Sequence, residues 1–334
     1  MDPVTPYPPL ARAPLRLGGM FGIAWQLYKR GFWQMFFVSF LLTGLPVLLV
    51  MLSYFSMLRH ILPDILNSLS AGGGFERLGA LLSSLLFMGV AMLLFTFLLG
   101  PMYQGTVYLE MEERMEGRAG TLGQLFRCAI PMGLKRFYTT FLALFVLQLG
   151  IRMVASFIGS LGAVGTIFSA LPALGDSPST SMLTSGFGSL GITTLLELLV
   201  ALCAGAFLAL IYPIAAHERK FAFSAVGRSF QLTAKHFWRI LGATLLFSLV
   251  AGTISGIICL FSLFLLQNYT AMFVLLAVLL AFAVALVAPY SAAFHTALYV
   301  DIAARVDGPE LSVIDPDSVP DPDPDELRDG PRTL

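Results

Sequence analysis

Six long apolar blocks divide this chain, and each is about as long as a membrane is thick. They cover residues 32–54, 81–103, 138–161, 192–214, 238–266 and 271–291. A helix needs about 20 mostly apolar residues to cross the roughly 30 Å of hydrocarbon in a bilayer. Only 12% of the 334 residues are charged, whereas soluble domains carry about 25%. The blocks therefore predict an all-α integral membrane protein with six transmembrane helices.

A short motif stands directly before each odd-numbered block. In each of its three copies a basic residue is followed two positions later by Phe and then by a second aromatic residue. Aromatic side chains and cations concentrate at the membrane interface, so we interpret these residues as interfacial anchors. The chain returns through the next block, which predicts three repeated hairpins over residues 20–117, 121–220 and 223–308. The anchors are Arg30, Phe32 and Trp33, Lys135, Phe137 and Tyr138, and Lys235, Phe237 and Trp238.

A stretch with helical periodicity that is too polar to cross a membrane precedes the motif. Residues 230–232 of the third copy match residues 25–27 of the first, and Pro131 interrupts the second copy. An amphipathic helix of this kind lies in the interface, with its apolar face in lipid and its cations at anionic headgroups. We therefore expect a cytoplasmic interfacial amphipathic helix before each hairpin. The apolar face of the first one consists of Phe21, Ala24, Trp25 and Tyr28.

The distribution of Lys and Arg between the connecting segments predicts the orientation. The segments that carry the motifs contain 13 of these residues, whereas the opposite loops contain only Arg59 and Arg77. Short segments rich in Lys and Arg stay on the cytoplasmic side. Because the number of spans is even, we expect a multi-pass plasma-membrane protein with both termini in the cytoplasm.

The two ends of the chain are too polar and too rich in proline to belong to the membrane domain. Residues 1–19 contain five prolines and lack the apolar core of a cleavable signal peptide. Residues 309–334 contain eight acidic residues and two arginines, with Asp-Pro repeats that cannot form a helix. We expect both segments to be disordered around a membrane domain over residues 20–308. The acidic tail is either solvated or docked on the basic cytoplasmic surface or a partner.

Each even-numbered block contains a proline near its cytoplasmic end. Pro101, Pro213 and Pro289 each remove a backbone hydrogen bond, and we expect a helix kink at each of them. Beyond Pro101 and Pro289 we expect the helices to continue into the cytoplasm. Both continuations are predicted to end at a glycine, Gly117 and Gly308.

Two charged residues lie deep inside the predicted spans, Arg152 and Glu197. At 1.5 Å per residue, Arg152 is about 21 Å beyond Tyr138 and Glu197 is about 24 Å before Pro213. An unpaired charge at such depth is costly, so we predict an intramembrane ion pair between them. This pair is either structural or part of a water-lined cavity that contacts a substrate. The remaining alternative is two unpaired groups near the outer interface.

The sequence contains no arrangement of residues that is typical of catalysis. Nucleotide-binding loops, nucleophile elbows and zincin helices do not occur, and the three cysteines have no paired spacing. None of the four histidines has metal-ligand spacing with a carboxylate. We therefore expect no enzyme activity, cofactor, metal or nucleic-acid partner. An acidic run is interpreted as the water-facing side of a helix end, with a cation site as the alternative: Glu110, Glu112, Glu113 and Glu116.

Three segments together resemble a known bacterial family: residues 24–33, their echo at 229–238, and residues 297–301 followed by Asp307-Gly308. The family comprises the six-span membrane domain that in some proteins precedes a glycerophosphodiester phosphodiesterase domain, and its free-standing relatives. The resemblance covers nearly the whole chain except the two tails. Because nothing after Pro309 is expected to fold, it does not imply lipid headgroup hydrolysis here.

Three classes of function are compatible with these features. We expect a non-catalytic scaffold or accessory subunit in the cell envelope, because interfacial helices and a charged tail occur without a catalytic constellation. The alternative is a transporter or permease for a lipid or other amphiphile, with a polar site near Arg152 and Glu197. An intramembrane enzyme is the third class. The expected partners are membrane lipids with anionic headgroups on the cytoplasmic side and a membrane protein.

Overall fold

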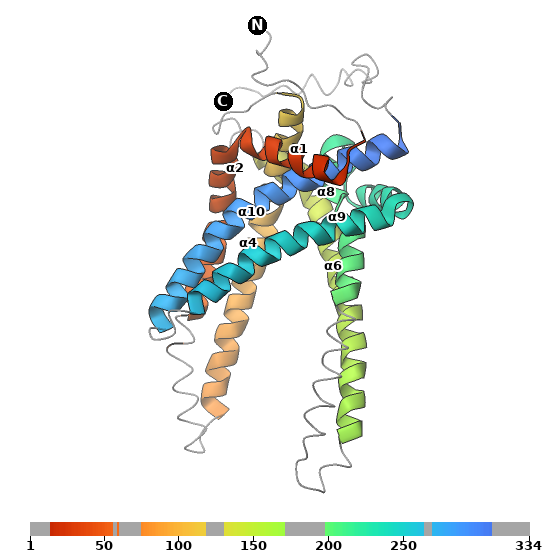
Figure 1. Ribbon diagram of the computed structural model, residues 1–334. Helices are drawn as coiled ribbons and strands as arrows, with labels where there is room; N and C mark the ends of the chain where they lie inside the picture. The colour runs from red at the N-terminus through yellow and green to blue at the C-terminus, as the bar shows by residue number, and fades with distance from the viewer. Residues whose placement is uncertain are drawn as a thin grey trace, which may run out of the picture.

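The computed structural model describes residues 14–55, 59, 75–117, 130–170, 198–263 and 269–308, and all regular structure within them is helical (Figure 1). The elements are α1 (Leu17–Lys29), α2 (Phe32–Ser39), the π-helix η1 (Phe40–Gly44), α4 (Phe75–Met115), α6 (Ile130–Ala170), α8 (Ile211–His217), α9 (Phe223–Leu263) and α10 (Tyr269–Val306). Residues 45–55 and 198–208 are also helical. The predicted all-α class is therefore confirmed for the described residues.

Six stretches of these helices are long and apolar enough to cross a membrane, which agrees with the six predicted spans. The expected continuation of the second and sixth helices is also present, because α4 and α10 run through Pro101 and Pro289. Each is followed by a glycine with positive φ, 82° at Gly117 and 79° at Gly308. The six stretches are Phe32–Phe55, Gly89–Met115, Phe137–Phe157, Leu198–His217, Phe223–Ile258 and Met272–Val306.

The buried core is concentrated at one end of the bundle, which we call the polar end. This end holds α1, α8 and the last turns of α4 and α10, and it lies at the top of Figure 1. Met111, Phe137, Leu210 and Phe294 are fully buried there. By contrast, only 17% of the apolar window of the third span and 18% of that of the fifth are buried inside the protein.

Helices α4 and α6 touch near the polar end and separate toward the opposite end. Gly100 of α4 lies against the ring of Phe141, and the ring of Phe97 lies 5.9 Å from Phe141 and 4.6 Å from Phe145 between centroids. Beyond this contact the two helices diverge (Figure 1), and their large apolar side chains are exposed. Lipid tails are as apolar as these side chains, so in a bilayer no hydrophobic force draws the separated halves together.

Helix α1 crosses the polar end and rests on α10 (Figure 1). Its buried face consists of Met20, Ala24, Leu27 and Tyr28. Trp25, which the sequence analysis assigned to the apolar face expected to lie in lipid, is 48% exposed, and its ring lies 6.2 Å from that of Tyr290 of α10 between centroids. The Tyr28 hydroxyl donates to a backbone carbonyl of α10 at 3.1 Å. Burial raises the pKa of Tyr28 to about 12, so this donor keeps its proton at neutral pH.

The helical backbone is interrupted at the same motif position in the first and third copies. Gly31, with φ −155° and ψ 36°, separates α1 from α2, and His236, with φ −132° and ψ 31°, bends α9. Each lies between the basic residue and the Phe of its motif. In the second copy α6 runs through the motif from Ile130, and residues 118–129 lie outside the described part. The separate helix expected before the fifth span is thus the first part of α9.

The folded part of the chain begins earlier than the predicted boundary at residue 19. Helix α1 starts at Leu17, and Leu15 before it forms hydrogen bonds to α9 and α10. Composition alone indicated disorder here. It could not reveal the partners that fix Leu15, because they are nearly 300 residues away along the chain. Residues 1–13 and 309–334, which include the predicted acidic tail, lie outside the described residues.

Gly44, the last residue of η1, brings the first span close to the backbone of α10. A Cβ at Gly44 would lie 2.9 Å from the carbonyl oxygen of Ala281 and 3.5 Å from the Cβ of Ala285. The nearest obstacle is a backbone atom of a long helix, which cannot move aside as a flexible side chain does. The close approach of these two spans therefore requires glycine at position 44.

We predict that Gly44→Ala destabilises the protein by about 1–3 kcal/mol, because overpacking forces the two backbones apart. Gly89→Ala is the matched control, since a Cβ at Gly89 of α4 meets no atom within 4 Å. Alanine is the better helix former there by about 1 kcal/mol, so this variant should be neutral or stabilised. Thermal unfolding in detergent, followed by tryptophan fluorescence, measures both variants. Equal unfolding midpoints would contradict the close contact.

Candidate functional site

Three clusters of charged side chains lie at the polar end, and each is centred on one carboxylate. Glu110 and Asp301 are almost completely buried, with 2% and 0% of their surface exposed, and the side chain of Glu218 is 16% exposed. A carboxylate removed from water is stable only if cations and hydrogen-bond donors replace its lost hydration. The partners of these three acids therefore determine how the helix ends are held.

The Glu110 cluster joins the end of α4 to the start of α2. Arg114 lies one helical turn after Glu110, and its Nη2 and Nε atoms are 2.5 and 2.7 Å from Glu110 Oε1. Arg114 Nη2 also donates to Gln34 Oε1 at 2.7 Å, and Arg30 donates to the carbonyl of Arg114 at 3.1 Å. The interpretation of this acidic run as a water-facing side is therefore wrong for Glu110, because α2 covers that side of α4.

Glycine at position 31 makes room for the buried guanidinium of Arg114. A Cβ at Gly31 would lie 1.3 Å from Arg114 Nη1, which is far closer than non-bonded atoms approach. This Nη1 atom is buried against the break between α1 and α2 and has no hydrogen-bond partner in the described part of the chain. The equivalent positions of the other two motifs are Arg136 and His236. The first motif therefore has a glycine where the other two have larger residues, because the guanidinium of Arg114 occupies this space.

The Asp301 cluster joins the N-terminal segment to α9 and α10. Asp301 accepts hydrogen bonds from Arg239 Nε at 2.7 Å, from Arg305 Nε at 2.9 Å and from the backbone N–H of Leu15 at 2.7 Å. Both arginines also donate to the carbonyl of Leu15, Arg239 at 2.5 Å and Arg305 at 2.8 Å. One acid and two arginines therefore bind both backbone polar groups of a single residue.

These first two clusters are built from equivalent positions of the first and third hairpins. Residues 108–117 and 299–308 share the pattern Tyr-x-acid-x-x-x-Arg-x-acid-Gly, and its first acid and its arginine form the ion pair in both. Gln34 and Arg239, which bond to these pairs, each directly follow the Phe-Trp of their motif. Sequence reasoning did not identify these pairs, although the ten-residue pattern occurs twice and was the signal for them.

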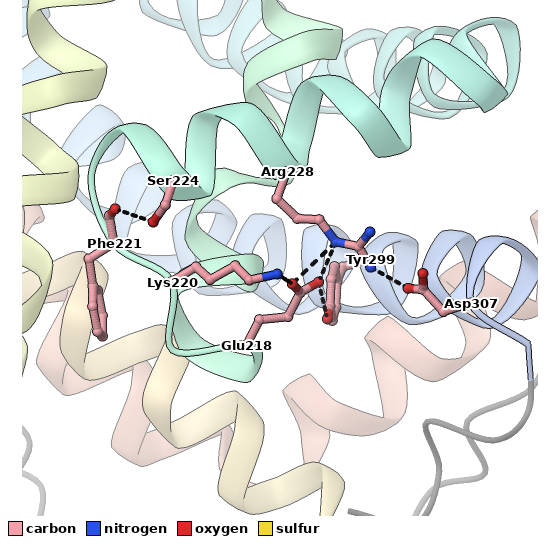
Figure 2. Close-up of polar contacts among 7 residues, drawn as sticks. All are labelled: Glu218, Lys220, Phe221, Ser224, Arg228, Tyr299 and Asp307. Carbon is pink, nitrogen blue, oxygen red and sulfur yellow. Dashed lines mark hydrogen bonds and ion pairs between the residues drawn. The ribbon is translucent and has the colours of Figure 1, made fainter.

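The Glu218 cluster connects the end of α8 to both α9 and α10 (Figure 2). Glu218 accepts hydrogen bonds from Lys220 at 2.8 Å, from Arg228 Nε at 3.1 Å and from the hydroxyl of Tyr299 at 3.1 Å. Arg228 also donates to Asp307 near the end of α10. One carboxylate thus holds the adjoining ends of three helices.

The link between α8 and α9 is a tight turn that keeps this acid close to α9. Arg219 and Ala222 have positive φ angles of 52° and 53°, which are uncommon for residues other than glycine. The Ser224 hydroxyl donates to the Phe221 carbonyl at 2.7 Å (Figure 2), and the Ala222 N–H donates to Thr140 Oγ1 of α6 at 2.9 Å. Contacts with α6 therefore hold a backbone conformation that these residues rarely adopt.

The aromatic anchors predicted from the motifs occupy different environments. Phe137 is fully buried in the core, whereas Phe32 and Phe237 are half-buried. The second aromatic residue of each motif is the exposed one, which leaves its ring free to contact lipid. These residues are Trp33, Tyr138 and Trp238, with exposed fractions of 66, 40 and 80%.

The basic anchors and the predicted kink sites also differ between the copies. Lys235 is exposed, Arg30 belongs to the Glu110 cluster, and the side chain of Lys135 lies outside the described part. Helices α4 and α10 stay helical through their prolines, but a turn at residues 209–210 precedes α8 and Pro213. Pro213 cannot donate to the carbonyl four residues earlier, which accounts for this turn.

The predicted ion pair between Arg152 and Glu197 is described at one end only. Arg152 is exposed on α6 and forms no ion pair with any residue that the structure describes. Glu197 lies outside the described residues, so the pair stays a prediction. An open apolar groove of about 390 Å³ lies beside α6, between residues 146–154, Val200 and Phe223. Its lining residues lie on the side of α6 opposite Arg152, because successive residues are 100° apart around a helix.

The clusters hold helices together and do not resemble a catalytic centre. Within the described ranges, no group of three or more His, Cys, Asp and Glu residues is placed to hold a metal ion. No known family model, curated protein or solved structure matches the chain. The resemblance to the membrane domain that precedes glycerophosphodiester phosphodiesterases therefore stays a hypothesis based on the sequence motifs.

We predict that Asp301→Asn releases the N-terminal segment from the polar end. The substitution removes the negative charge that Arg239 and Arg305 share. Charge-assisted hydrogen bonds contribute about 1.5–3 kcal/mol each, so opening should become about tenfold more frequent or more. Arg16 is exposed, and the rate of tryptic cleavage after Arg16, followed by mass spectrometry, measures this opening.

Asp307→Asn is the matched control for this experiment. Asp307 lies on the same helix end, but it bonds to Arg228 and not to Leu15. Cleavage after Arg16 should therefore stay close to the wild-type rate in this variant. An unchanged rate in Asp301→Asn would show that the cluster does not hold the segment.

We predict that Glu218→Gln weakens the loss of stability at acidic pH. Burial alone raises the pKa of Glu218, but the hydrogen bonds and charges of Lys220 and Arg228 outweigh it and lower the pKa. A lowered pKa stabilises the fold above the unfolded-state value of about 4.3, and this stabilisation is lost as the pH falls through the folded-state pKa. Thermal midpoints should therefore fall less steeply with acidification in Glu218→Gln than in the wild type. Glu113→Gln, which changes an exposed acid, should follow the wild-type curve.

Proposed function

We propose that this chain is a non-catalytic, lipid-associated scaffold or accessory subunit of the cell envelope, held in the plasma membrane by its six spans. In this proposal the polar end and both termini lie in the cytoplasm. The support for this orientation is the excess of Lys and Arg in the segments of the polar end, since such segments remain on the cytoplasmic side.

The observation that carries the proposal is the closed character of the two buried ion-pair clusters. Charged groups that serve transport or catalysis face a cavity or a substrate. Glu110 and Asp301 are instead enclosed by side chains and backbone groups of neighbouring helices. A polar end fixed in this way favours a protein that presents a constant surface to a partner.

The spans leave large apolar surfaces available to a membrane partner. Exposed leucines occur on several spans, with exposed fractions of 66% for Leu94 on α4, 57% for Leu199 and 65% for Leu249 on α9. Helices in a bilayer associate through packing and hydrogen bonds, so faces that are not packed within one chain can pack against another. These faces can contact lipid or a membrane partner, and the crosslinking test below distinguishes the two.

We also propose that the chain consists of three repeated hairpins, each preceded by an interfacial helix. Two features of the first and third hairpins support this proposal. The backbone break falls at the equivalent residues Gly31 and His236, and the residue after each Phe-Trp pair bonds to the acid–arginine pair of the same hairpin. Helix α1, which crosses the polar end, is the best described of the interfacial helices.

Transport of a lipid or other amphiphile is the second candidate function. It requires a polar cavity that reaches Arg152 and Glu197. The groove beside α6 has an apolar lining and lies on the face of that helix opposite Arg152.

The test is photo-crosslinking in the native membrane from one position on each of several spans. A diazirine analogue of leucine, placed separately at Leu94, Leu199 and Leu249, reports what touches the exposed faces. Leu298 is the matched control, because it is a leucine with 0% of its surface exposed. We expect at least one exposed position to give a discrete crosslinked protein and the control to give none.

Crosslinked products identified by mass spectrometry then decide the proposal. A single protein in stoichiometric amount would identify the partner of the scaffold. Only lipid adducts at all three exposed positions, together with purification of the protein alone in mild detergent, would overturn the scaffold proposal.

A further inference from the structure

The open apolar groove beside α6 lies within the third span. One wall is the face of α6 between Val146 and Val154. Val200, on the helical stretch over residues 198–208, and Phe223, the first residue of α9, complete the lining. All of these residues belong to the described part of the chain. Because the groove lies along a membrane span, it opens onto lipid hydrocarbon and not onto water.

Phe223 borders the groove on the side of the polar end. Ala222, directly before it, donates its N–H to Thr140 of α6 at 2.9 Å. Thr140 is about 9 Å nearer the polar end than Val146 along α6. The ring of Phe223 is 72% exposed although it lines the groove, so lipid can reach it. The tight turn between α8 and α9 thus places an aromatic ring between the groove and the polar end.

The width of the groove suits a hydrocarbon chain better than a helix. Its volume of about 390 Å³, divided by the roughly 12 Å of α6 between Val146 and Val154, gives a cross-section of about 33 Å² and a width of about 6 Å. A helix with its side chains is about 10–12 Å wide and does not fit. The volume is at the lower end of the range of small-molecule pockets, about 300–1,000 Å³. An extended acyl chain is therefore the occupant that matches both the size and the apolar lining.

A glycine keeps the middle of the groove open. Gly150 lies halfway between Val146 and Val154 and is exposed, and a Cβ at this position would meet no atom within 4 Å. A larger side chain here would therefore fill the groove without a clash inside the protein. This position allows the groove to be blocked while the fold stays intact.

The turn before Phe223 carries two exposed cations, Arg219 and Lys220. Lys220 donates to Glu218 at 2.8 Å, so its charge is shared with the Glu218 cluster. Cations close to the membrane surface attract anionic headgroups. A lipid whose chain enters the groove past Phe223 has its headgroup at the level of this turn. Charge complementarity therefore favours an anionic lipid with its headgroup beside Arg219.

We propose that the groove beside α6 binds one acyl chain of an anionic phospholipid in the leaflet on the side of the polar end. The glycerol end of the chain lies at Phe223, its methyl end lies toward Val154, and the headgroup lies beside Arg219. In the orientation proposed above this is the cytoplasmic leaflet, which contains anionic lipids. The site gives a location to the lipid association in the proposed function, and it rests on that association and not on a protein partner.

The test uses the purified full chain in nanodiscs of phosphatidylcholine with a minor fraction of phosphatidylglycerol that carries a diazirine on one acyl chain. We expect residues 146–154 to be labelled more heavily than Leu249 of α9, which is 65% exposed but outside the groove. Gly150→Leu should lower the groove labelling about tenfold, because the leucine displaces about two methylene groups of the chain. Gly89→Leu is the matched control and should label like the wild type. Gly89 is also exposed and open for a Cβ, but it lies on α4.

Arg219→Gln tests the headgroup. It should lower the groove labelling by phosphatidylglycerol about fivefold, which is the preference that one cation near the surface gives to an anionic lipid. Labelling by the matching phosphatidylcholine analogue should not change. Lys235→Gln, which removes an exposed cation elsewhere at the polar end, should label like the wild type. Equal groove labelling by the two lipids in the wild type would overturn the assignment of an anionic headgroup.

Three further results would overturn the acyl-chain site. The first is wild-type labelling of residues 146–154 no higher than that of Leu249, which would indicate ordinary solvating lipid and needs no variant. The second is equal labelling in Gly150→Leu and the wild type, measured on protein with a cooperative thermal transition. The third is a crosslinked dimer from a diazirine analogue of leucine at Val154, which would assign the groove to a second copy of this chain. Only this chain is present in the nanodiscs, so these results are independent of the protein crosslinks that test the scaffold.

Discussion

Pairing of buried carboxylates is the requirement on which the polar end depends. Glu110 and Asp301 have lost almost all contact with water, and each has gained an arginine one turn away on its own helix and a partner from another element. Removing one member of such a pair costs about 3–5 kcal/mol, although the intact pair adds little net stability. The main effect of the clusters is therefore to determine which helix ends meet. Their contribution to the stability of the bundle is small.

The distribution of burial along the spans also depends on where polar contacts between helices occur. Packing between helices in lipid comes from close fit and polar bonds, because hydrocarbon competes for every apolar face. At the polar end, ion pairs and the close contact at Gly31 supply both, and within the spans Gly44 supplies a close fit between the first span and α10. Farther along, a Cβ at Gly89 of α4 or at Gly150 of α6 would meet no atom within 4 Å, and the helices separate. The splayed shape is thus the expected result of confining the polar bonds to one end.

Block length was sufficient to predict the six spans, and the glycines at 117 and 308 were sufficient to predict two helix ends. Both inferences depend on properties of the local chain. Burial of Glu110 could not be predicted, because it depends on which side of α4 a distant element covers. The ordering of Leu15 has the same cause, since its partners belong to the last two helices. The ten-residue pattern at residues 108–117 and 299–308 indicated the ion pairs. It is recognised only when the first and third hairpins are compared with each other.

The Asp301 cluster also imposes an order on biosynthesis. Leu15 leaves the ribosome before any of the six spans, whereas Asp301 and Arg305 are added after five of the six spans have been made. The site that receives the N-terminal segment therefore does not exist until the sixth span is nearly complete, and α1 cannot take its final place on α10 before then. Docking of Leu15 therefore requires the sixth span, so a protease that recognises the free segment before α1 would distinguish molecules that contain this span from molecules that lack it.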